Sequence, residues 1–105
     1  MFYTNGNDIH ITRGDTGTFT LNLTQDGQPY DYSDDTVVLT VRRNVHDTEI
    51  LIQKTITYGN NVAIEPADTK NLLGVYWYDV QLTTAGGVVD TVIPPSKFIV
   101  RADVT

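Results

Sequence analysis

The sequence has no cysteine, one methionine and one tryptophan among its 105 residues. Without cysteine the chain can form neither a disulfide framework nor a thiolate metal site, and it has no thiol nucleophile. Lysine and arginine are also scarce, with seven against 13 acidic residues and a net charge of −6. Because nucleic acids and anionic membranes are bound mainly through clusters of these cations, we expect neither as a partner.

Long apolar runs and a basic leader are missing as well. No stretch approaches the ~20 apolar residues that a membrane-spanning helix requires. The first eight residues, MFYTNGND, show no basic start followed by an apolar run. We therefore expect no secretory signal peptide and synthesis in a cytoplasm.

Strong helix formers are few. Ala, Leu, Glu, Lys, Met and Arg together supply 21 residues, whereas Thr, Val, Ile and Tyr supply 42. Because β-branched and aromatic residues fit a pleated, half-buried surface, this composition predicts an all-β protein and excludes a helical bundle. The length, without any linker-like stretch, predicts a single domain over residues 1–105.

Apolar and polar residues alternate along most of the chain, which is typical of strands with one buried face. The pattern predicts strands over 8–12, 16–24, 36–43, 49–57, 62–65, 75–84, 88–93 and 97–104. We expect pairing to break or kink at Pro94 and Pro95, which lie between the last two of these segments. One short helical turn is predicted near 66–73, between Pro66 and Gly74. Seven to eight short strands separated by turns predict a two-sheet antiparallel β-sandwich.

The alternation also predicts which side chains point inward. They are Phe19, Leu21 and Leu23; Val37, Leu39 and Val41; Ile50, Ile52 and Ile56; Val62 and Ile64; Tyr76, Tyr78, Val80 and Leu82; and Phe98, Val100 and Ala102. Lys54 interrupts one of these faces, so we expect it near a sheet edge.

The connection before the 75–84 strand narrows the sandwich to an immunoglobulin-like one. A short segment carrying Asp68, Leu72 and Gly74 precedes a Tyr-x-Tyr strand. In immunoglobulin-like domains a tyrosine hydroxyl at this corner bonds back to the preceding backbone. Tyr76 is the candidate for this structural corner, and Tyr78 is the alternative.

No residue pattern supports catalysis or metal binding. His10 and His46 are the only histidines, and each lacks a second ligand at metal spacing. Ser33 and Ser96 do not lie in a nucleophile motif. We therefore expect no enzyme activity, no cofactor and no metal.

Two short motifs have structural interpretations. The acidic stretch 31–35 imitates the start of a calcium-binding loop, but Thr36 stands where that loop needs glycine. Arg13-Gly14-Asp15 spells an integrin-recognition tripeptide. The favoured interpretation is that Gly14 makes the turn between two strands.

Trp77 is the most informative single residue, because its strand face also carries Asp79 and Gln81. A solvent-facing tryptophan can stack on a sugar or anchor a partner protein. The alternative is that both faces of the strand are covered and Trp77 belongs to the core. Further candidate contacts for a partner or a glycan are Arg42, Arg43, Tyr30 and Tyr58.

Segments spread over nearly the whole chain resemble the immunoglobulin-like N-terminal domain of baseplate upper proteins of tailed phages, and related small tail and prophage proteins. These segments are residues 11–16, 19–23, 26–30, 37–43, 67–69, 74–82 and 98–105. The resemblance implies a non-catalytic virion component, made in a bacterial cytoplasm, that docks neighbouring tail proteins or further copies of itself. The alternative function is a carbohydrate- or cell-surface-binding sandwich that uses Trp77, Tyr76 or the loop tyrosines at positions 30, 32 and 58.

Overall fold

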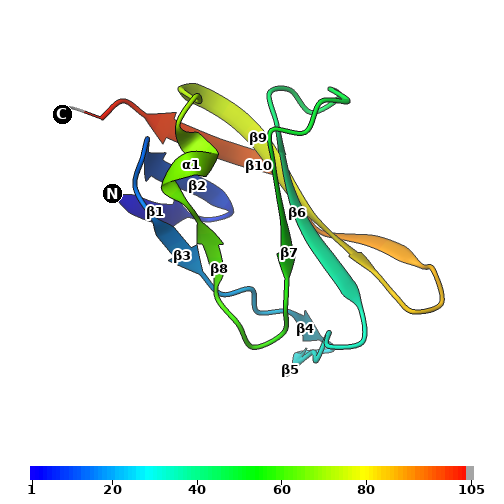
Figure 1. Cartoon of the computed structure of the whole chain (residues 1–105). Coiled ribbons are helices and arrows are strands. Elements are labelled where there is room, and N and C mark those ends of the chain that lie inside the picture. The colour runs from blue at the N-terminus through cyan, green and yellow to red at the C-terminus, as the bar shows by residue number, and fades with distance from the viewer. Residues whose placement is uncertain (104–105) are drawn as a thin grey trace.

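The computed structural model describes residues 1–103 and confirms the predicted all-β sandwich class (Figure 1). A six-stranded main sheet has the order β1-β2-β10-β9-β6-β7. Its strands are β1 (Phe2–Asn5), β2 (Asp8–Thr12), β6 (Thr36–Arg42), β7 (Ile52–Ile56), β9 (Gly74–Thr83) and β10 (Val89–Arg101). The remaining elements are the pair β3 (Gly17–Phe19) and β8 (Val62–Ile64), the hairpin β4 (Thr24–Gln25) and β5 (Gln28–Pro29), and helix α1 (Pro66–Thr69).

The main sheet is mixed, which corrects the expectation of antiparallel pairing throughout. β2 runs parallel to β10, with Ile9 opposite Phe98 and Ile11 opposite Val100. β2 also pairs antiparallel with β1, a strand that the alternation does not predict. The parallel contact is possible because β2 and β10 come from opposite ends of the described chain, so no tight turn has to join them.

The second layer is shorter than predicted. Within the strand expected over 16–24, residues Gly17–Phe19 form β3, whose partner β8 has three residues, and Thr24 begins the separate strand β4. Leu21 is nevertheless buried while Thr20 and Asn22 are exposed, so the predicted alternation continues beyond the ladder. The carbonyl of Leu21 accepts a hydrogen bond of 2.8 Å from the Tyr32 hydroxyl.

The core lies between the inner face of the main sheet and the layer that contains β3, β8 and α1. The predicted inward side chains of β6 and β9 are all buried, and Val37, Leu39, Val41, Val80 and Phe98 are fully enclosed. The predictions for Ile50 and Ala102 are wrong, because both are exposed. β7 begins only at Ile52 and β10 ends at Arg101, so the alternation has no ladder to maintain it at these two positions.

The two consecutive prolines lie inside one long strand, β10, and its ladder with β9 is irregular at them, as predicted. Register shifts between Thr91 and Ile93 and between Ile93 and Ser96 accommodate them. Such irregularities absorb a residue that cannot donate to the ladder. From Ser96 to Val100, β10 pairs regularly with β9. Residue 104, the end of the predicted last strand, lies outside the described residues.

Two smaller expectations concern Lys54 and the helix. β7 forms one edge of the main sheet, and the Lys54 ammonium there lies 2.8 Å from the Asp68 carboxylate. The helix has only one turn, over Pro66–Thr69, rather than the range 66–73. The Asp68 carboxylate accepts a 2.7 Å hydrogen bond from the Glu65 amide, which caps this turn.

Leu39→Ala tests the location of the core. Leu39 lies in the middle of β6 and is fully enclosed, so its truncation should lower the free energy of unfolding by about 2–5 kcal/mol. Denaturant unfolding followed by circular dichroism measures this change. The matched variant Val89→Ala, at an exposed position, should change stability by less than about 0.5 kcal/mol. Equal effects of the two variants would contradict this core.

Candidate functional site

The structure places Tyr76 at the corner where the sequence expects it. Its hydroxyl accepts a 2.8 Å hydrogen bond from the Leu73 amide and donates one of 3.1 Å to the Leu73 carbonyl. Arg43, a candidate partner contact, packs with its guanidinium carbon 5.2 Å from the centre of the Tyr76 ring. Asp68 does not join this corner, because its carboxylate caps α1 and pairs with Lys54.

Tyr78, the alternative corner residue, has a different environment. Its hydroxyl donates to the carbonyl of Asn7, and its ring meets Phe98 edge to face with centroids 6.5 Å apart. Burial, together with the nearby charge of Asp8, raises the pKa of Tyr78 to about 12. The folded structure therefore favours the protonated, neutral form of the Tyr78 hydroxyl.

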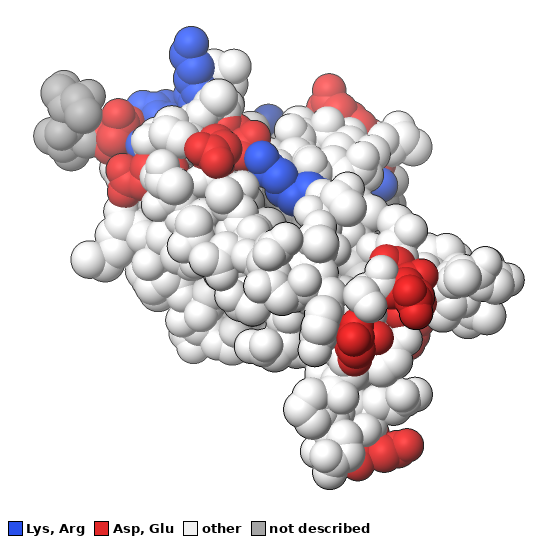
Figure 2. All heavy atoms as spheres, turned by 60° about the horizontal axis from the view of Figure 1, so that its bottom comes forward, with Lys and Arg blue, Asp and Glu red and all other residues white. Residues whose placement is uncertain are grey.

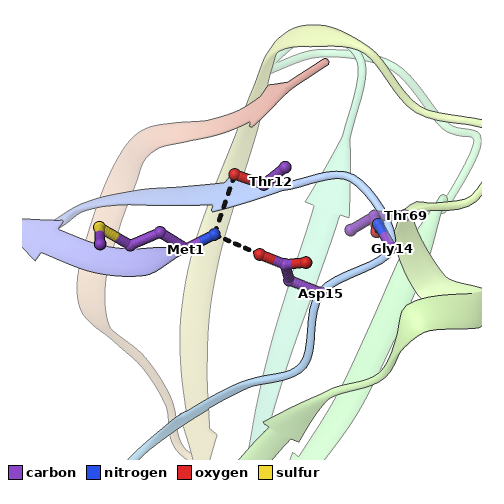
Figure 3. Close-up of polar contacts among 5 residues, drawn as sticks. All are labelled: Met1, Thr12, Gly14, Asp15 and Thr69. Atoms are coloured by element: carbon purple, nitrogen blue, oxygen red, sulfur yellow. Dashed lines mark hydrogen bonds and ion pairs between the residues drawn. The ribbon is translucent and has the colours of Figure 1, made fainter. Parts of the chain in front are cut away.

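The integrin-type tripeptide is part of the packing between the β2–β3 connection and α1 (Figure 3). The amide of Gly14 donates a 2.9 Å hydrogen bond to the hydroxyl of the buried Thr69. The Asp15 carboxylate contacts the amino group of Met1, which also donates to the Thr12 hydroxyl at 2.9 Å. Gly14 has a φ of +85°, a conformation that favours glycine. These contacts support the turn interpretation of the tripeptide.

Trp77 lies on the outer face of the main sheet and is half-buried, so it is neither fully exposed nor part of the core. It is opposite Arg42 across the β6–β9 ladder, and Asp79 is opposite Thr40. A shallow hollow of about 40 Å³ lies among these residues. A second hollow of about 260 Å³ shares Thr40, Arg42 and Asp79 and extends along the sheet.

The Arg42 side chain has a polar atom without a hydrogen-bond partner among the described residues. Its Nε atom is buried and has no hydrogen-bond partner within residues 1–103. A buried donor without a partner costs free energy.

Tyr30 and Tyr58 lie near the β4–β5 hairpin and the β7–β8 turn, at another end of the fold (Figure 1). The Tyr30 hydroxyl donates a 2.5 Å hydrogen bond to Asp35. The Tyr58 ring packs edge to face on Tyr32, with centroids 5.1 Å apart. The five candidate contact residues therefore do not form one site: Trp77 and Arg42 meet, whereas Arg43 and the two tyrosines lie elsewhere.

A groove of about 500 Å³ lies between the β4–β5 hairpin and the β9–β10 hairpin, whose tip projects away from the body (Figure 1). The side chains lining it include Leu23, Tyr30, Leu82, Val88, Asp90 and Val92. At the tip, the exposed fractions of Val88 and Val89 are 64% and 60%. Sequence reasoning missed this groove, and the only signal for it was the pair of adjacent valines after a Gly-Gly turn.

Neither a candidate metal cluster nor a membrane-crossing helix is present in the part of the chain that the structure describes. Within residues 1–103, no three His, Cys, Asp or Glu side chains are grouped so that they could hold a metal ion. In the same range no helix has the length and apolar character needed to cross a bilayer.

Comparisons with protein-family models, curated proteins and solved structures find no match. Function is therefore inferred from the chemistry and geometry of these surfaces.

The raised pKa of Tyr78 predicts a loss of stability in alkali. Between pH 10 and about 12 the folded chain keeps the Tyr78 proton while the unfolded chain loses it. Stability is therefore full below pH 10 and falls as the pH rises through this range. Ultraviolet absorbance should show a tyrosine ionising near pH 12, and Tyr78→Phe should remove that step. A Tyr78→Phe titration identical to the unmodified protein's would contradict the assignment.

Proposed function

We propose that the protein is a non-catalytic assembly module of a phage or prophage tail that docks neighbouring virion proteins. The strand arrangement supports the family resemblance behind this proposal. β10, β9, β6 and β7 lie in one sheet opposite β3 and β8, the layout of a variable-type immunoglobulin sandwich. The Tyr76 hydroxyl also bonds to the preceding backbone, as such domains require.

The exposed valines at the tip of the β9–β10 hairpin are the observation that carries the docking role. Val88 and Val89 are exposed, and Val88 lines an open groove together with Leu82 and Val92. An apolar surface of this kind is stabilised when a partner covers it. β9 pairs with β6 from Trp77 to Thr83, so the main sheet holds the base of this hairpin.

The docking role predicts complex formation with tail proteins encoded beside this gene. Size-exclusion chromatography of co-expressed pairs should show co-elution with at least one of them. The double variant Val88→Ser/Val89→Ser should weaken that complex about tenfold or more, because it removes two apolar side chains from the contact.

Ile50→Ser is the matched control, since Ile50 is an exposed apolar residue in a different loop. It should leave the complex intact, and circular dichroism should show that all variants remain folded. Neighbouring genes for metabolic enzymes, together with no co-eluting tail protein, would contradict the proposal.

Carbohydrate binding is the second candidate, and the hollow beside Trp77 favours it. The half-buried indole ring of Trp77 offers a stacking surface. The side chains of Arg42 and Asp79 line the hollow and offer a donor and an acceptor for hydroxyl groups. Protein sugar sites commonly combine these elements: an apolar ring and a few convergent polar groups.

If this second function holds, Trp77→Ala should abolish binding on a glycan array, because the stacking surface is lost. Tyr58→Ala is the control, since its exposed ring lies at a different end of the fold. An array on which the unmodified protein binds nothing, or on which the two variants lose binding equally, would exclude the hollow as a sugar site.

A further inference from the structure

Charge is distributed unevenly over the molecule. The two segments that form the groove, 20–36 and 82–93, contain no Lys, Arg or His. They contain five acids, Asp26, Asp31, Asp34, Asp35 and Asp90. The rest of the chain has eight acids and seven bases and is therefore close to neutral, with a net charge of −1. Five of the six net negative charges lie at this groove end, the name used below for the two segments.

The space-filling view makes the separation visible. In Figure 2 the basic residues gather in the upper part of the molecule, and the lower part shows acidic residues without basic neighbours. Cations elsewhere are partly neutralised locally: Lys54 pairs with Asp68, and Arg13 pairs with Asp103 at 2.8 Å. No such ion pair is formed by the acids of the groove end within residues 1–103.

The negative field also acts on Tyr30 in the groove wall. The pKa of Tyr30 is raised, first by its hydrogen bond to Asp35 and then by desolvation and by the charges of Asp35, Asp31 and Asp34. These carboxylates therefore lie close enough to act on the same surface. Because they have no counter-charge there, a cation brought to the groove end gains attraction without first displacing a protein partner.

The groove has a mixed lining, in which polar side chains (Asn22, Thr24, Gln25, Thr84 and Asp90) stand among apolar ones. Leu23, Leu82 and Val92 line its interior, and Asp90 stands in its wall. A polypeptide in an extended conformation presents alternate side chains to opposite sides. Such a segment can place apolar side chains in the groove while its lysine or arginine side chains face the carboxylates.

We propose that the groove end binds an extended basic segment of a neighbouring protein. This rests on the proposed assembly function and specifies the chemistry of its partner. A second copy of this chain is a poor occupant, because its other surfaces carry no net positive charge and its groove end repels another groove end. The carboxylates of the groove end attract the partner. The apolar side chains that line the groove, Val88 among them, contact its apolar residues.

The test uses a short fluorescent peptide that alternates lysine with valine, and a glutamate–valine peptide of the same length. Fluorescence anisotropy should detect binding of the lysine peptide only. Raising the ionic strength to about 1 M, where the screening length falls to about 3 Å, should remove most of it. Chemical-shift changes in the NMR spectrum should map to 20–36 and 82–93.

The decisive variant is Asp26→Asn/Asp34→Asn/Asp90→Asn, which leaves the structural contacts of Asp31 and Asp35 in place. It should weaken lysine-peptide binding about tenfold, as expected for the loss of three exposed charge pairs. The matched control Asp47→Asn/Glu49→Gln/Glu65→Gln removes the same net charge elsewhere and should bind normally.

Three results would overturn the inference. They are equal binding of both peptides, equal weakening by both triple variants, and self-association that the groove variant abolishes. The proposed function can fail separately. If tail proteins co-elute equally with the groove variant and the lysine peptide does not bind, docking stands and the basic partner is wrong. If the peptide binds but no tail protein co-elutes, the binding of a basic segment at the groove end stands and the tail assignment is wrong.

Discussion

The second layer of the sandwich is much smaller than the sheet it covers, and the rest of the structure depends on this mismatch. Two paired strands of three residues each face a sheet of six strands. The hydrophobic driving force closes the core where the layers overlap, around Leu39, Val80 and Phe98. Where β3 and β8 end, Leu23 and Tyr30 cover the interior only in part. The groove is therefore a direct consequence of an incomplete second layer.

The position of the acids follows from the same mismatch. Carboxylates avoid the closed core, and the turns at the open end provide solvated positions for them. Asp31 accepts a hydrogen bond from the Ser33 amide, and Asp35 accepts one from Tyr30, so two of these acids also order their loops. Apolar side chains and uncompensated negative charge thus share one end of the protein. This pairing gives the proposed docking surface its chemical selectivity.

The alternation predicted the strands of the main sheet other than β1, and most inward side chains, because one buried face imposes a period of two. It could not predict the parallel contact of β2 with β10, which depends on residues about 90 positions apart. The irregular pairing at Pro94 and Pro95 could be predicted from sequence, because proline cannot donate to a ladder. The groove could not be predicted from the alternation either, because two hairpins that are distant in the sequence form it. Trp77 was identified from sequence, but its half-buried state depends on neighbours such as Arg42 across the ladder.

Hydrogen–deuterium exchange with and without a tail protein from the neighbouring genes tests the central claim most directly. Docking at the open end of the sandwich predicts slower exchange confined to residues 20–36 and 82–93. It also predicts unchanged exchange along the outer face around Trp77 and at the corner held by Tyr76. Protection confined to the outer face, or absent from both segments while a complex forms, would contradict the account.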